Sequence, residues 1–144
     1  MSILKKSPFA IMCIVGLIFM AVYLIIDQSE TSSAAGNEIT AVEQAGYSIE
    51  VSLGRAPAQI LKNNELQVHI SDVQGNPVSH ATIHFLLKMP HMFCGTFEGT
   101  ASQTEPGAYQ GNAVPLMEGD WEALVDIELN GQTLHVTHPF KAAR

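Results

Sequence analysis

The fold of this chain is decided by residues 121–136, which read WEALVDIELNGQTLHV. Apolar residues occupy alternate positions on both sides of Asn130-Gly131; they are Trp121, Ala123, Val125, Ile127, Leu129, Leu134 and Val136. Alternation at period two indicates strands that bury one face. Asn-Gly favours a type I′ turn, because both of its residues take positive φ at low cost. This stretch therefore predicts an antiparallel β-hairpin.

The same alternation recurs upstream of this hairpin. It marks strands at 47–53, 66–70 and 81–87, and shorter strands at about 97–103 and 108–114. No helical period interrupts them. Six or seven short strands separated by turns predict an all-β fold, an immunoglobulin-like antiparallel β-sandwich formed by residues 46–144 as one domain. Alternation does not determine the order of the strands in such a sandwich.

The N-terminus differs from the rest of the chain. Lys5 and Lys6 precede an uncharged, largely apolar run over residues 8–26. Nineteen residues give roughly 28 Å of helix, close to the ~30 Å hydrocarbon thickness of a bilayer. The lysines precede the run and acidic residues follow it, which orients the N-terminus toward the cytoplasm. We expect residues 1–27 to be a cytoplasmic stub and single transmembrane helix, with the β domain on the periplasmic side of the inner membrane.

A cleaved signal peptide is the competing interpretation of this run. Signal peptides have shorter apolar cores, of about 7 to 15 residues, closely followed by a small-residue cleavage site. Here the nearest such site, at residues 33–35, lies nine residues beyond Ile26. We therefore expect an uncleaved anchor, joined to the domain by a flexible, polar tether over residues 28–45.

Charge and the lack of known motifs argue against several classes of function. From residue 28 onward, five Lys and Arg residues face thirteen Asp and Glu residues. Such a domain repels nucleic acid, which we do not expect as a partner. The sequence contains no Gly-x-Ser-x-Gly, phosphate-loop, His-Glu-x-x-His or Cys-x-x-Cys motif. We accordingly expect a protein that is not an enzyme.

One short segment concentrates metal-binding side chains. Met89, His91, Met92 and Cys94 fall within six positions, and we expect them in a loop. Thioether and thiolate ligands are soft and suit Cu(I), and imidazole accepts either copper oxidation state. Met117 joins them if its turn packs beside this loop. The competing interpretation is that the methionines plug the open end of the sandwich and that the cysteine is an inert buried residue.

Other histidines lie opposite the apolar stripes of their strands. If the second and third predicted strands pair, His69 and His84 become cross-strand neighbours and a secondary metal site, for example for Cu(II). The simpler interpretation is a solvated polar face. His138 is interpreted as a strand-end residue, and Trp121 as the centre of the core.

The two cysteines do not predict an internal disulfide. Cys13 lies within the expected membrane span and Cys94 within the exported domain. A thiol-redox role for Cys94 is a weaker hypothesis, because the domain offers no resolving cysteine.

From residue 61 to residue 140 the chain resembles the YtkA-like domain family, which includes FixH-like proteins. The resemblance rests on Val68–Val78, on Ala81–Phe85 with Met89–Met92, on Pro106–Tyr109 and on Met117–Trp121. FixH-like proteins are single-span membrane proteins linked to the assembly of copper-containing terminal oxidases. The entry to the membrane span and Cys94 both depart from the family pattern.

The resemblance and the soft ligands together favour a membrane-tethered copper-binding accessory protein. Its expected cofactor is copper, chiefly Cu(I), and its expected partner a membrane-bound oxidase or a copper transporter. The alternative function is a metal-free interaction module that docks on a membrane complex.

Overall fold

The computed structural model describes residues 38–144, apart from the side chains of Phe93 and Cys94. This part of the chain is all β, as the sequence predicts, and contains no helix. It therefore holds no helix able to cross a membrane, and the expected span at residues 8–26 lies outside the described residues. The strands are β1 (Ile39–Gln44), β2 (Tyr47–Leu53), β3 (Ala58–Gln59), β4 (Asn64–Asp72), β5 (Thr82–Met89), β6 (Met92–Glu105), β7 (Ala108–Ala113), β8 (Gly119–Leu129) and β9 (Gln132–Ala143).

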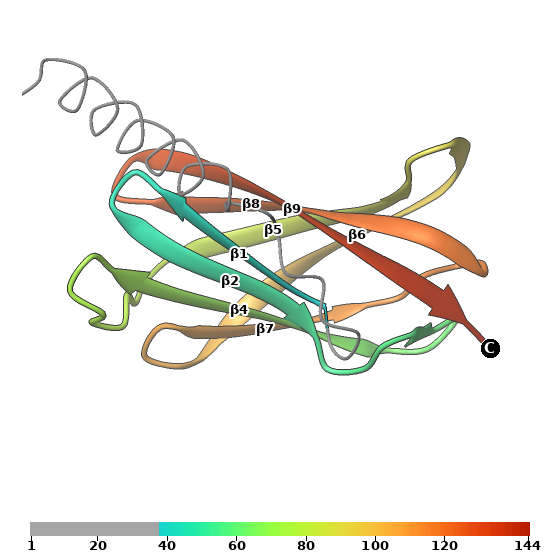
Figure 1. The fold of residues 1–144 in the computed structure, drawn as a ribbon, viewed down its shortest axis with the longest axis horizontal. Helices are drawn as coiled ribbons and strands as arrows, with labels where there is room; N and C mark the ends of the chain where they lie inside the picture. The colour runs from blue at the N-terminus through green and yellow to red at the C-terminus, as the bar shows by residue number, and fades with distance from the viewer. Residues whose placement is uncertain (1–37) are drawn as a thin grey trace, which may run out of the picture. The chain divides into compact units, whose positions relative to one another are not determined.

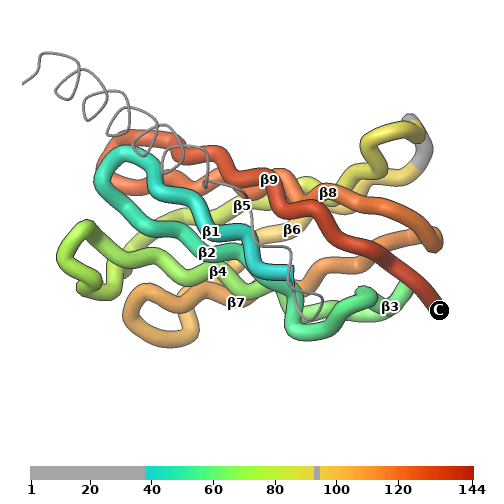
Figure 2. The backbone as a smooth tube through the Cα atoms, viewed as in Figure 1, coloured from blue at the N-terminus to red at the C-terminus, as the bar shows by residue number. Residues whose placement is uncertain are grey.

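The strands form one curled sheet in the order β1-β2-β4-β7-β6-β5-β8-β9-β3. All neighbours are antiparallel except β3 and β9, which pair in parallel close to the C-terminus (Figure 2). β1, β2, β4 and β7 make one wall, and β6, β5, β8 and β9 make the other (Figure 1). The curl brings β1 beside β9, where Thr40 hydrogen-bonds to His138.

Alternating side chains from both walls fill the interior. The buried residues include Leu66, Val68 and Ile70 of β4, Ile83, Phe85 and Leu87 of β5, and Trp121, Ala123, Val125, Ile127 and Leu129 of β8. These are the apolar stripes of the predicted strands. Asn130 and Gly131 have φ of 51° and 75°, as a type I′ turn requires, and the flanking register runs from Leu129↔Gln132 to Trp121↔Phe140. The predicted final hairpin is confirmed.

Three features of the fold differ from the prediction. The described residues form nine strands rather than six or seven, because β1 and the two-residue β3 were not expected. The predicted tether reached residue 45, whereas Ile39–Gln44 pair with β2 from Ile39↔Ser52 onward. β1 is an edge strand whose apolar residues, Ile39, Ala41 and Val42, do not fall on one face, so it lacks an apolar period. The third difference is that β6 begins at Met92, so Met92 and Cys94 belong to a strand and not to the expected metal-binding loop.

Candidate functional site

The Met-rich segment is a tight hairpin rather than a loop. Met89 is the last residue of β5, Met92 is the first of β6, and the two are directly paired. Only Pro90 and His91 lie between them, both exposed. Our expectation of a loop free of strand register is wrong, because Met89 and Met92 still pair after a register shift that follows Leu87↔Phe97. Residues directly opposite each other in an antiparallel pair project from the same face, so the two thioether side chains share one side of the hairpin.

Met89 lies on the inner side of β5 and fills space at the end of the sheet. It continues the buried series Ile83, Phe85 and Leu87 and packs against the core. Its Cε lies 2.8 Å from the position that a Cβ on Gly119 would take. The thioether methyl therefore occupies the space of the missing side chain. Met92, by contrast, is 47% exposed.

The segment before β8 packs beside this hairpin, as the prediction for Met117 requires. Leu116 Cδ1 lies 3.1 Å from the position of a Cβ on Gly95, which follows the turn on β6. Met117 is partly buried against the core, and its carbonyl oxygen accepts a hydrogen bond of 3.0 Å from Trp121 Nε1. Two segments distant in the sequence thus bring Met89, Met92 and Met117 to one end of the domain. Cys94 belongs to β6, and its side chain lies outside the described residues.

The expected pairing of His69 with His84 is wrong. β4, which carries His69, pairs with β2 and β7, whereas β5, which carries His84, pairs with β6 and β8. His69 lies opposite Glu50 and Ala108, and His84 opposite Thr100 and Asp126. The two histidines therefore belong to different walls of the curled sheet.

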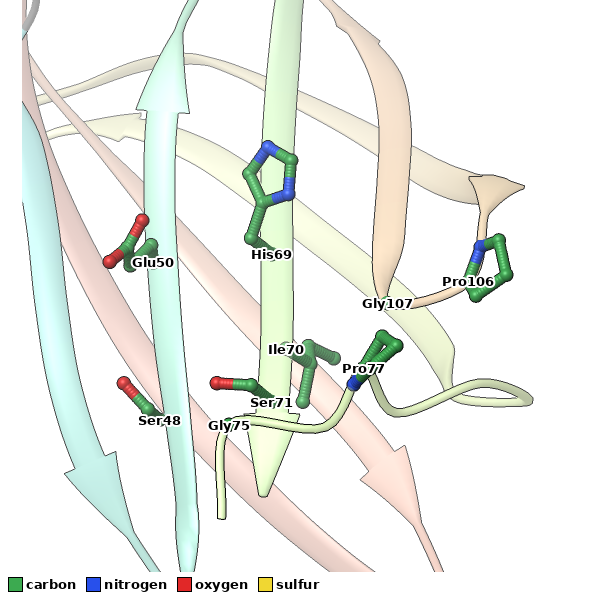
Figure 3. A pocket seen from close by; sticks show the side chains of 9 residues that line it. All are labelled: Ser48, Glu50, His69, Ile70, Ser71, Gly75, Pro77, Pro106 and Gly107. Atoms are coloured by element: carbon green, nitrogen blue, oxygen red, sulfur yellow. The ribbon is translucent and has the colours of Figure 1, made fainter. Parts of the chain in front are cut away.

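His69 borders a shallow cavity of about 270 Å³ on the outer face of β2 and β4. Figure 3 shows Glu50 beside it on the neighbouring strand, with Ser48 and Ser71 below and Pro77 and Pro106 at the rim. This neighbourhood offers one imidazole, one carboxylate and two hydroxyl groups. Within residues 38–144, no three His, Cys, Asp or Glu side chains are placed to hold one metal ion together. Methionine is not one of these four residue types, so the thioethers of the hairpin are not covered.

The interpretation of His138 as a strand-end residue is wrong, because β9 continues to Ala143 and buries this side chain. It is 1% exposed, and its Nδ1 lies 2.9 Å from Thr40 Oγ1. Its Nε2 is buried and has no hydrogen-bond partner among residues 38–144. Burial lowers the pKa of this imidazole to about 4. The ring stacks on Phe140 and borders an apolar cavity of about 300 Å³ that Leu53 and Pro57 also line. The signal was available in the sequence, because His138 continues the inward series of Leu134 and Val136.

Comparison with known proteins establishes the family. The sequence pattern described as YtkA-like matches residues 41–126, which is more than half of the chain. The chain belongs to the YtkA-like family. The matched range of this YtkA-like protein includes the Met89–Met92 hairpin and Met117–Trp121. No curated protein matches the chain.

Two solved structures are similar to this YtkA-like protein in part. A DUF4785 family protein from Legionella pneumophila subsp. pneumophila str. Philadelphia 1 has 11% sequence identity and a TM-score of 0.47. An engineered protein has 12% identity and a TM-score of 0.45. They match 69% and 82% of this chain, which spans only 29% and 22% of their respective lengths.

The turn motifs of this YtkA-like protein meet in space and hold the walls together. The Tyr109 hydroxyl donates to the carbonyl oxygen of Val78 and accepts from the amide of Ala81, both at 3.0 Å. Gly107 lies so close to Pro77 that a Cβ at this glycine would be 2.7 Å from the proline Cβ. Pro106–Tyr109 therefore has a structural role. The exposed residues of the Met-rich hairpin are Pro90, His91 and Met92. Among the described residues, we assign them no such structural role.

Proposed function

We propose that this YtkA-like protein is a membrane-tethered, extracytoplasmic copper-binding accessory protein. The observation that carries the proposal is the direct pairing of Met89 with Met92 at one end of the domain, with the Met117 segment packed alongside. We also propose that the nine-stranded curled sheet is a variant of the immunoglobulin-like sandwich. In this account the protein has no catalytic activity of its own.

The chemistry of the hairpin suits Cu(I). Thioether sulfur is a soft, uncharged ligand, and imidazole accepts copper in either oxidation state. Met89 and Met92 supply two thioethers on one face, and His91 lies in the turn between them. Met117 and the Cys94 thiol complete the proposed ligand set. The excess of acidic residues in the domain also favours the approach of a cation.

The exposure of the site suits transfer of the metal. Met92 and His91 are exposed, whereas Met89 and Met117 pack against the core. A partner that receives copper must reach the ion by ligand exchange, and the exposed pair gives it access. The proposed partner is a copper-containing membrane oxidase or a copper transporter. The segment at residues 8–26 would keep the site near such a partner at the membrane surface.

A metal-free interaction module is the second candidate. The observation that favours it is the packing of Met89 against Gly119, since a thioether that fills an end cavity needs no metal to explain it. In this account the exposed turn residues contact a protein partner directly. Metal binding separates the two functions.

The experiment is an anaerobic titration of the full-length protein, purified in detergent, against a chromophoric Cu(I) chelator. We expect the protein to remove one Cu(I) ion per chain from the chelator, with sulfur in the X-ray absorption signature of the bound ion. No removal of copper, together with copurification of a membrane complex by the metal-free protein, supports the interaction module instead. A Cys94→Ser variant tests the thiol separately, because a thiolate ligand must lose its proton and makes affinity rise with pH.

A further inference from the structure

Three metal-binding side chains form one row across the outer face of β5, β8 and β9. His84 is directly opposite Asp126, and Asp126 is directly opposite His135. All three are exposed. Opposed residues in an antiparallel sheet project from the same face, so the carboxylate lies between two imidazoles. Asp126 and His135 face each other across the β8–β9 hairpin, and His84 is brought beside Asp126 by the pairing of β5 with β8.

His135 is already oriented by the carboxylate. Its Nδ1 lies 2.6 Å from Asp126 Oδ1. Because an ionised carboxylate can only accept a hydrogen bond, Nδ1 carries the proton, and in the neutral ring the lone pair is then on Nε2. A divalent ion can take the place of the shared proton when the ring proton moves to Nε2, so that Nδ1 and the carboxylate coordinate the same ion.

The charge around this row favours a cation. Glu128 is two residues from Asp126 on the same exposed face of β8. Among residues 38–144, the Lys and Arg ion pairs of this wall go to Glu118, Asp120 and Glu122, and Asp126 pairs only with His135. The carboxylate is therefore not neutralised by a lysine or an arginine.

We propose that His84, Asp126 and His135 form a binding site for a borderline divalent cation, Zn²⁺ or Cu²⁺. Imidazole and carboxylate suit these ions, and Cu²⁺ should bind more tightly than Zn²⁺. The outer strands hold the two imidazoles about 10 Å apart at their backbones, and binding requires the exposed rings to lean over the carboxylate. Among residues 38–144 these three side chains do not share a ligand position in the structure.

This site is independent of the proposed Cu(I) site. His84 lies on the outer face of β5 and Met89 on the inner face, five residues further along. The ligands also differ in kind, because nitrogen and oxygen donors replace sulfur. A Met89→Leu/Met92→Leu variant should therefore leave the outer site unchanged, and failure of either site leaves the other intact.

The test is a Zn²⁺ competition titration with a chromophoric chelator on the full-length protein and its variants. We expect His84→Gln, His135→Gln and Asp126→Asn each to weaken Zn²⁺ binding at least tenfold. His69→Gln is the matched control, since His69 is also an exposed strand histidine opposite a carboxylate, Glu50, and should leave the affinity unchanged. Equal loss in the control, or no loss in either of the other histidine variants, would overturn the proposal.

A second measurement keeps the proposal testable in the unaltered protein. Zn²⁺ should shift the imidazole NMR signals of His84 and His135 together, with one stoichiometry. Cu²⁺ should give an electron paramagnetic resonance spectrum with hyperfine coupling to two imidazole nitrogens. A shift of only one of these two histidines, or of every exposed histidine to the same extent, would contradict a shared site.

Discussion

Trp121 donates its indole N–H to the carbonyl oxygen of Met117 at 3.0 Å. The bond connects Trp121, the largest of the fully buried side chains among residues 38–144, to the segment that packs beside the Met-rich hairpin. Because Trp121 is fixed by the core, the hydrogen bond also fixes the backbone that carries Met117. The core and the candidate site are thus coupled through one hydrogen bond between residues four positions apart.

The first prediction follows from this coupling. Trp121→Ala should reduce the free energy of unfolding by about 3 to 5 kcal/mol, because it leaves a large cavity. Trp121→Phe keeps an aromatic ring but orphans the Met117 carbonyl, and should cost only about 1 to 2 kcal/mol. Urea unfolding followed by circular dichroism checks both values. Equal losses in the two variants would mean that the indole does not fill the core.

Two glycines with the same backbone conformation provide the second prediction. Gly107 and Gly131 both have φ of 75°, but a Cβ at Gly131 meets nothing within 4 Å, whereas at Gly107 it meets Pro77 and the carbonyl oxygen of Ile70 below 3 Å. Gly131→Ala should cost about 1 kcal/mol for the left-handed backbone alone. Gly107→Ala should cost about 2 to 5 kcal/mol, since overpacking is added. Comparable thermal unfolding of the two variants would contradict the close approach.

The buried imidazole of His138 predicts a pH dependence of stability. Its pKa is lowered from the ordinary 6.5 to about 4, so the unfolded chain takes up the proton more readily than the folded one. Stability should be complete above pH 6.5 and fall as the pH drops toward 4, by up to about 3 kcal/mol. His138→Leu removes the titrating group and should flatten that part of the profile. Urea unfolding at several pH values measures the effect, and an unchanged slope in the variant would exclude His138 as its origin.

The anchor is tested by alkaline extraction of membranes that contain the full-length protein. We expect the protein to stay in the pellet at full length, because an apolar run of nineteen residues is long enough to span the bilayer. A soluble product shortened by roughly thirty residues would show that a signal peptidase had removed the run.

Alternation in the sequence predicted which residues are buried but not which strands are neighbours. The inward series of β8 and β9 follows from period two, because one face of each strand must leave water. β5 pairs with β8 and not with β4. This pairing depends on how the chain connects the strands, and such connections leave no local pattern in the sequence. For this reason the expected contact of His69 with His84 was wrong, and the row of His84, Asp126 and His135 was not predicted.

For the candidate site, too, the residue types could be predicted from the sequence, but the contacts between distant segments could not. The ligand types around Met89 were evident from the sequence, but the pairing of Met89 with Met92 depends on where the strand register ends. The approach of the Met117 segment depends on its packing against a distant hairpin. β1 escaped prediction because its apolar residues, Ile39, Ala41 and Val42, do not alternate on one face and no residue of the strand is fully buried.

The most direct test of the account is the Cu(I) affinity of a Met89→Leu/Met92→Leu variant of the full-length protein, measured by competition with a chromophoric chelator. Leucine keeps the volume and apolar character of both positions, so stability should change by less than about 1.5 kcal/mol per site. The soft ligands are lost, and the account predicts that Cu(I) affinity falls at least a hundredfold while His69→Gln, a control on the far wall, retains it. A double variant that binds Cu(I) as tightly as the parent protein, or a parent protein that binds none, would contradict the copper site.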